Sequence, residues 1–271
     1  MKKERRDFLK IAGVAAAAGV GAGSAFHSLL SGEVQAAGLK RAGKVKVKAD
    51  LRLGMAIDIN RFLANPSLAQ RCIDACHSFH NVPNFGNDKD EVKWLWTDNF
   101  ENVFVKDSHY RQSEKLEGRP VLALCNHCDN PPCVRACPTK ATFKKANGVV
   151  AMDYHRCIGC RFCMAACPYG ARSFNWRDPR GKDERGRPFI GELNQEYPAR
   201  TRGVVEKCNF CTERLAVGEA PLCVEEARAY GAMYFGNLND PNSEISRVLR
   251  DTFTIQRRAA LGTYPSVFYI V

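Results

Sequence analysis

Thirteen cysteines occur among the 271 residues of this chain, and most stand in closely spaced groups. The segment from Cys157 to Pro168 has the spacing C-x2-C-x2-C-x3-C-P, which is typical of sequences that bind [4Fe–4S] clusters. The segment from Cys125 to Pro138 repeats this plan with a wider middle gap. Three thiolates on one tight loop can reach three corners of a cubane, and the fourth cysteine ligates the cluster of the partner motif.

This exchange of the fourth cysteine predicts two complete cluster sites. The first site is formed by Cys125, Cys128, Cys133 and Cys167. The second site is formed by Cys157, Cys160, Cys163 and Cys137. Two other interpretations fit less well: zinc ribbons use paired C-x2-C motifs without a triplet, and cysteines so close in sequence seldom reach disulfide geometry.

The five remaining cysteines form two incomplete motifs. An early C-x3-C pair has the spacing of the last two cysteines of a motif whose first two positions hold Pro66 and Ala69. A late motif has its first three cysteines, but Ala227 stands at the fourth position. A fourth cluster would need the cysteines missing from both motifs, so the sequence predicts three clusters. The five cysteines are Cys72, Cys76, Cys208, Cys211 and Cys223.

The same exchange rule predicts the ligands of the third site, which are Cys208, Cys211, Cys223 and Cys76. Cys76 holds the fourth position of the early motif, and Cys72 is then predicted to be unligated. The alternative, with Cys72 as the ligand and Cys76 spare, stays open.

The N-terminal segment has the composition of an export signal. Arg5 and Arg6 precede an Ala- and Gly-rich apolar run over residues 11–30, which is typical of a twin-arginine (Tat) signal. We expect residues 1–36 to be a cleaved signal peptide and 37–50 to be a linker, with an uncleaved membrane anchor as the alternative. Export would place the folded protein on the periplasmic, extracytoplasmic face of the cytoplasmic membrane.

The formal net charge of +11 does not predict nucleic-acid binding. Part of it lies in the signal peptide, and three oxidised clusters with four thiolates each would add about −2 apiece. The sequence has no stripe of Lys and Arg interleaved with aromatic residues, which a nucleic-acid groove would need.

Hydrophobic patterning around the cysteines predicts an α+β fold, in which a strand, a cysteine loop and a short helix recur. We expect two interleaved bacterial-ferredoxin-like β/α modules with inserted β-strands and loops in one domain, residues 51–271. The predicted parts are an outer module (51–90 and 204–240), an inner module (118–176), a loop insertion (177–203) and a C-terminal helix and strand (241–271). Single strands are expected at 53–59, 121–124, 148–153 and 267–271. Residues 92–105 are expected to form two strands around an Asp98-Asn99 turn, and 243–260 a helix.

With these motifs the chain resembles the four-cluster ferredoxin-type subunits of membrane respiratory complexes, such as those of polysulfide, dimethyl sulfoxide and formate-dependent nitrite reductases. The resemblance covers about residues 51–271 and includes Lys207-Cys-Asn-Phe-Cys211. The missing outer cluster, the segment 76–83 and the export signal make it most like the exported DsrO-type subunit of the sulfite-reduction-associated complex. The resemblance implies a hetero-oligomeric complex with an NrfD-type, quinone-interacting integral membrane subunit and a multihaem cytochrome c.

Two function classes follow: a subunit that only passes electrons, and an oxidoreductase that converts a substrate. The sequence favours the first, because Gly-x-Gly-x-x-Gly, a phosphate loop and a Cys/His nucleophile pair are lacking. We therefore expect no enzyme activity from the chain alone, with the electron-transfer subunit of a molybdopterin oxidoreductase complex as the alternative assignment. The histidines that offer hydrogen bonds to cluster sulfur, or are ordinary polar residues, are His77, His80, His109, His127 and His155.

Overall fold

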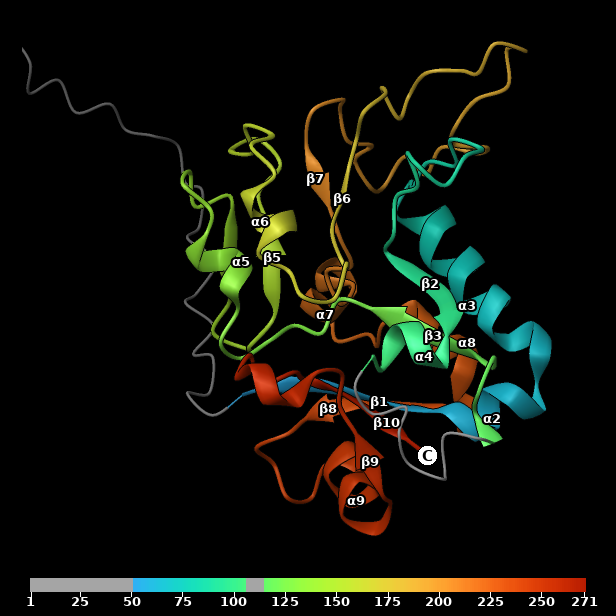
Figure 1. The fold of residues 1–271 in the computed structure, drawn as a ribbon, viewed down its shortest axis with the longest axis vertical. Coiled ribbons are helices and arrows are strands. Elements are labelled where there is room, and N and C mark those ends of the chain that lie inside the picture. The colour runs from blue at the N-terminus through green and yellow to red at the C-terminus, as the bar shows by residue number, and fades with distance from the viewer. Residues whose placement is uncertain (1–50, 106–114) are drawn as a thin grey trace, which may run out of the picture. The chain divides into compact units, whose positions relative to one another are not determined.

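The computed structural model describes residues 51–105 and 115–271 (Figure 1). These residues lie in one compact unit. The expected signal peptide, the linker and His109 lie outside the described residues.

A four-stranded sheet with the order β8-β1-β10-β9 joins the two ends of the described chain. Strand β1 (Leu53–Asp58) runs parallel to β10 (Val267–Ile270) and antiparallel to β8 (Met233–Asn237), and β10 also pairs with β9 (Thr254–Ile255). The first five residues of β1 are buried, as expected for a central strand covered on both faces. The predicted strands at both ends of the domain are therefore confirmed.

Three two-stranded sheets complete the β structure. Strand β2 (Leu95–Asn99) pairs with β3 (Pro120–Leu124), β4 (Thr142–Lys144) with β5 (Val150–Met152), and β6 (Ser173–Phe174) with β7 (Val205–Glu206). Together with the short helices, these small sheets confirm the α+β class.

The prediction of two strands over residues 92–105 is wrong. Strand β2 ends at Asn99, and helix α4 (Phe100–Val103) follows directly. The reason lies in Phe100, Val103 and Phe104, which are all buried and have the i, i+3, i+4 spacing of one helix face. The strand partner of β2 is β3, which lies beyond the region that sequence patterning assigned to a hairpin.

The early cysteine pair lies on a helix, where a cysteine loop was expected. After β1 the chain forms α2 (Ile59–Ala64) and α3 (Pro66–Phe79). Pro66 opens α3, a position that suits proline because its missing N–H has no helical partner there. Leu68, Cys72 and Cys76 follow at four-residue intervals and form the buried face of α3.

Short helices follow the other cysteine loops (Figure 1). These are α5 (Pro132–Arg135), α6 (Phe162–Ala165), α7 (Thr212–Ala216) and α8 (Leu222–Arg228). Helix α8 carries Cys223 and Ala227 and lies beside α3 in the structure.

The C-terminal helix is shorter than predicted. Helix α9 (Glu244–Asp251) is capped by Ser243, whose side chain accepts a hydrogen bond from the Ser246 N–H. It ends at Thr252 because the following residues extend to form β9 against β10, and a short 3₁₀ helix (Ala259–Leu261) comes later. Residues 177–203 contain no helix or strand. Across the described ranges, no helix has the length and apolar character needed to cross a membrane.

Candidate iron–sulfur sites

The first C-x2-C turn of each cysteine motif has the same backbone feature. The residue before its second cysteine has a positive φ: 41° at His127, 70° at Gly159 and 57° at Phe210. Left-handed residues in such turns direct successive backbone N–H groups to one side, which forms a concave anion site of the type found around iron–sulfur clusters. At Gly159 only glycine fits, because a Cβ atom would lie 2.4 Å from the Gly203 carbonyl oxygen.

The structure brings together the cysteines assigned to the first site. Cys125 and Cys128 follow strand β3, while Cys133 lies on α5. Burial raises the pKa of the Cys128 thiol to about 12, and the charges of Cys125, Cys133 and Cys167 add to this shift. The four thiols are therefore close enough to influence the charge of one another.

The cysteines assigned to the second site line a single small cavity. Its walls include Cys137 from the end of the α5 turn, Cys157 and Cys160 from the loop before α6, and Cys163 on α6. Three of these four residues are partly exposed, and only Cys163 is buried. The second site therefore lies close to the protein surface.

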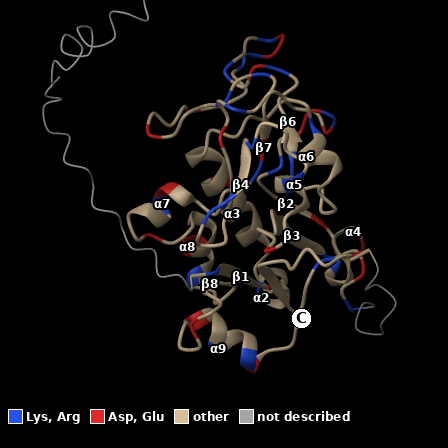
Figure 2. Cartoon of the chain, turned by 90° about the vertical axis from the view of Figure 1, so that its left-hand side faces the viewer, with Lys and Arg blue, Asp and Glu red and all other residues tan. Residues whose placement is uncertain are grey.

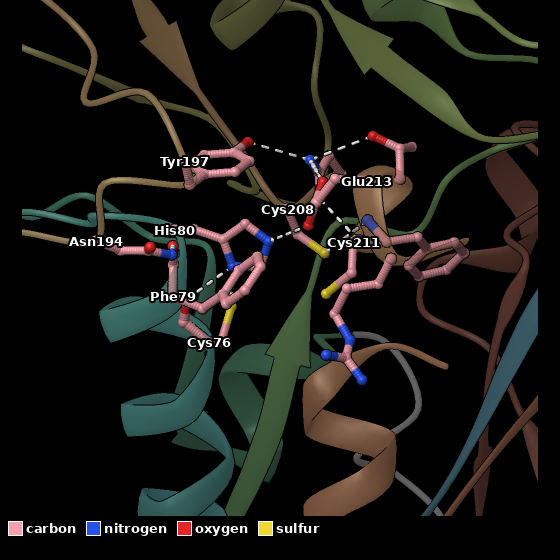
Figure 3. Close-up of polar contacts among 12 residues, drawn as sticks. Cys76, Phe79, His80, Asn194, Tyr197, Cys208, Cys211 and Glu213 are labelled. Carbon is pink, nitrogen blue, oxygen red and sulfur yellow. Dashed lines mark hydrogen bonds and ion pairs between the residues drawn. The ribbon is translucent and has the colours of Figure 1, made fainter. Parts of the chain in front are cut away.

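The third group combines a helix with a distant loop. Cys76 comes from α3, and Cys208 and Cys211 come from the loop before α7 (Figure 3). Burial raises the pKa of Cys76 well above its usual range, and the charges of Cys208, Cys211 and Cys223 raise it further. The structure thus places Cys76 among the three cysteines of the late motif.

Cys72 has a different environment one turn earlier on α3. Its thiol donates a hydrogen bond to the Cys223 carbonyl oxygen, at an S···O distance of 3.5 Å. Burial and the charge of Glu226 raise the pKa of Cys72 to about 12. Cys72 also lies near enough to Cys223 to affect the pKa of that thiol. The choice of Cys76 over Cys72 as iron ligand stays a prediction, which is supported by the proximity of Cys76 to the three cysteines of the late motif.

The donor set fits [4Fe–4S] clusters. All thirteen cysteines are free, and twelve of them fall into three groups of four thiols. Next to Cys125, the Asn126 side chain is buried, and neither polar atom of its amide has a hydrogen-bond partner in the part of the chain that the structure describes. An unsatisfied buried amide is costly, and a sulfur-rich anionic group beside it would accept its N–H. Binding iron would also displace protons from thiols whose pKa burial has raised.

The three sites follow one another in the order third, first, second. Burial raises the pKa of Cys208 in the third site, and the charge of Cys125 in the first site is the next contribution. Burial likewise raises the pKa of Cys163 in the second site, and the charge of Cys133 in the first site raises it further. Exposure rises along this order, because every cysteine of the third site is buried and most of the second site are not.

Two buried cations lie beside these sites. From the sequence, Lys207 was named only as part of a motif, and Arg172 was not named. The Arg172 guanidinium is 4% exposed, donates to Thr142, and lies near Cys133 and Cys163. Burial acts to lower the pKa of Arg172, but the negative charge of these cysteines outweighs it and raises the pKa.

Lys207 is 1% exposed, and its Nζ donates to the carbonyl oxygens of Val150 and Cys208. Arg172 and Lys207 therefore supply buried positive charge where anionic clusters would bind.

His80 joins the third site to a carboxylate. Its ring is fully buried, with Nδ1 2.7 Å from the Cys76 carbonyl oxygen and Nε2 2.8 Å from Oε1 of Glu213 (Figure 3). Among the other candidates, burial lowers the pKa of His77 to about 4, and burial followed by the charge of Lys207 lowers that of His127. His155 is exposed. Sequence reasoning named His80 but missed Glu213, which no motif marks.

Comparison with known proteins supports the binding of 4Fe–4S clusters. Residues 121–182 match the family model described as a 4Fe-4S dicluster domain. The chain is 39% identical to the Hdr-like menaquinol oxidoreductase iron-sulfur subunit 1 of Archaeoglobus fulgidus, over 98% of this chain and 97% of that protein. It is 37% identical to a putative iron-sulfur subunit of dimethyl sulfoxide reductase from Halobacterium salinarum, over 80% of this chain and 78% of that protein. It is 33% identical to Protein NrfC of Escherichia coli, over 84% of this chain and 86% of that protein. The chain therefore belongs to the family of 4Fe–4S electron-transfer subunits of membrane oxidoreductase complexes.

Proposed function

We propose that this protein relays single electrons through three [4Fe–4S] clusters within a membrane-bound respiratory complex. The observation that carries the proposal is the line of three four-cysteine groups, which leads from a buried site to a partly exposed one. A [4Fe–4S] cluster held by such thiolates supplies one-electron redox chemistry at a potential set by nearby charge and hydrogen bonds.

The protein's own residues hold and tune these groups. The cysteine loops supply thiolates and converging N–H groups, while Lys207 and Arg172 place positive charge beside them without access to water. The electron-transfer role is supported by the relatives of this chain, which are iron-sulfur subunits of oxidoreductase complexes.

The surface over the second site supports contact with a partner at that end. Ile158, in the loop between Cys157 and Cys160, is 68% exposed, and Phe162, the first residue of α6, is 61% exposed. Trp176 is 44% exposed, with the Arg161 guanidinium 4.7 Å from its ring centroid. Exposed apolar groups gathered in one place are typical of interaction surfaces. We assign this face to the NrfD-type, quinone-interacting membrane subunit.

We further propose a DsrO-type complex in which a multihaem cytochrome c is the second redox partner. The menaquinol oxidoreductase relative in Archaeoglobus fulgidus supports a quinol-linked complex. The twin-arginine motif supports export, with residues 1–36 as the signal, 37–50 as the linker and the described domain on the periplasmic face of the membrane. Within this domain, the pairing of β6 with β7 supports the interleaving of the inner and outer modules.

The main alternative is the electron-transfer subunit of a molybdopterin oxidoreductase. It is favoured by the similarity to the dimethyl sulfoxide reductase protein of Halobacterium salinarum. Purification of the complex from native membranes, followed by haem, iron and molybdenum analysis, separates the two. We expect covalently bound haem and no molybdenum, whereas stoichiometric molybdenum without haem would contradict the DsrO-type assignment.

Export is tested separately with Arg5→Lys/Arg6→Lys, because the Tat pathway depends on the arginine pair. We expect the folded variant to accumulate in the cytoplasm. Unchanged export and membrane association would contradict the proposed location.

A further inference from the structure

An open groove lies on the outer side of the third site. It is formed by Ala75, Ser78 and Phe79 in the last turns of α3, by Leu222 at the start of α8, and by the loop 192–196. Its volume is about 590 Å³. The groove is separate from the exposed apolar surface over the second site, because the two share no residue.

The groove is next to the cysteines of the third site. Ala75 and Leu222 are the chain neighbours of Cys76 and Cys223, whose side chains turn into the protein while their neighbours line the groove. The lost fourth cluster makes this end terminal, because cysteine is absent at the positions that would have completed another site beyond it. These positions hold Pro66, Ala69 and Ala227.

Hydrogen bonds fix the wall of the groove. The Asn194 amide donates to the Phe79 carbonyl oxygen at 2.7 Å, and the Asn194 N–H donates to the Asn81 side chain at 2.8 Å. The Phe79 ring packs edge-on against His80, with centroids 5.1 Å apart. Phe79, Asn194, His80 and Cys76 appear together in Figure 3. The loop is thus held against the helix that carries Cys76, and the groove is preformed.

The charge of the groove is negative. Glu192 and Glu196 line it, both are exposed, and neither has an ion-pair partner among residues 51–105 and 115–271. No Lys or Arg of the described chain lines the groove, and Leu193 adds an apolar side chain that is 46% exposed. The surface near the second site has the opposite character, because Lys140 and Arg161 are exposed there, while exposed Arg156 pairs with Asp153. The charged residues of the chain are coloured in Figure 2.

We propose that this groove docks a basic redox protein, with lysines around an exposed cofactor edge, that exchanges electrons with the third site. The proposal rests on the electron-transfer function proposed above and adds where one partner binds and what charge it has. One electron passes in each encounter: either the partner's cofactor is oxidised by one electron and the iron–sulfur group of the third site is reduced, or the reverse. Opposite charge on the two ends of the relay would direct two different partners to the two ends.

The test uses the cluster-loaded protein, reduced with dithionite under anaerobic conditions and mixed with a basic monohaem cytochrome c in a stopped-flow instrument. The variant Glu192→Lys/Glu196→Lys reverses the charge of the groove. The matched control Glu117→Lys/Glu184→Lys makes the same charge change at exposed residues that do not line it. Rates are measured from low to high ionic strength.

We expect wild type to react fastest at low ionic strength and the groove variant to be slower by roughly tenfold or more, in keeping with the range of electrostatic steering. The rate of the control variant should fall much less than that of the groove variant. An acidic flavodoxin, used as a second probe, should react faster with the groove variant than with wild type. Equal rates for both variants, or dimerisation of wild type that the groove variant abolishes, would overturn the proposal. Iron content and EPR spectra of the same samples keep the two proposals apart, because absent clusters would contradict the electron-transfer function instead.

Discussion

The two cysteines of α3 provide the sharpest test of the third site, because they lie one helical turn apart and are both buried. Cys76→Ala removes the only thiol of α3 that lies near all three cysteines of the late motif. A site with three thiolates loses its cluster or retains a three-iron form. We expect iron to fall from about twelve atoms per chain to between about eight and eleven, since each complete cluster contains four.

Cys72→Ala is the matched control. It removes a thiol that donates one hydrogen bond, to the Cys223 carbonyl oxygen. The expected cost is about 1 kcal/mol of unfolding free energy, the usual size for a point mutation, with the iron content unchanged. Anaerobic iron and acid-labile sulfide analysis, with EPR spectra of the reduced protein, measures both variants. Loss of a cluster in Cys72→Ala but not in Cys76→Ala would refute the ligand assignment.

Three further substitutions test the surroundings of the sites. Glu206→Gln leaves the buried Arg200 without its carboxylate partner, and we expect a loss of about 3–5 kcal/mol in chemical denaturation; a change within error would contradict this role. Gly159 has a positive φ, and Gly159→Ala would place a Cβ atom 2.4 Å from the Gly203 carbonyl oxygen. We therefore expect iron analysis to show loss of the cluster of the second site. Full occupancy of that site would show that the turn adapts to the side chain. Lys207→Met removes buried positive charge beside Cys208, so an EPR-monitored redox titration should give a lower reduction potential for the third site. An unchanged or higher potential would count against tuning by this charge.

The sequence carried much of the information about the sites, because a cubane restricts the spacing of cysteines on a loop. This restriction allowed the grouping of Cys76 with Cys208, which are far apart in the chain but close in the structure. The end strands were also predictable, since their apolar residues are contiguous. The choice between Cys76 and Cys72 as ligand was not fixed by spacing alone, and the structure supports it only through proximity.

Other features depend on contacts that local patterns do not encode. The sequence around Phe100 and Val103 is compatible with a strand or a helix. A helix forms because it places both side chains on one buried face. Lys207 and Arg172 resemble ordinary surface cations in the sequence, and only the fold shows that they are buried beside cysteines. Glu213 likewise has no motif, because its partner His80 belongs to a distant helix end.

We propose that three [4Fe–4S] clusters occupy the three groups of cysteines. This proposal is tested most directly by the content of iron and acid-labile sulfide in the anaerobically purified protein, combined with an EPR-monitored redox titration. We expect about twelve atoms of each per chain and three one-electron transitions. About eight or about sixteen atoms per chain, or bound zinc without sulfide, would contradict it.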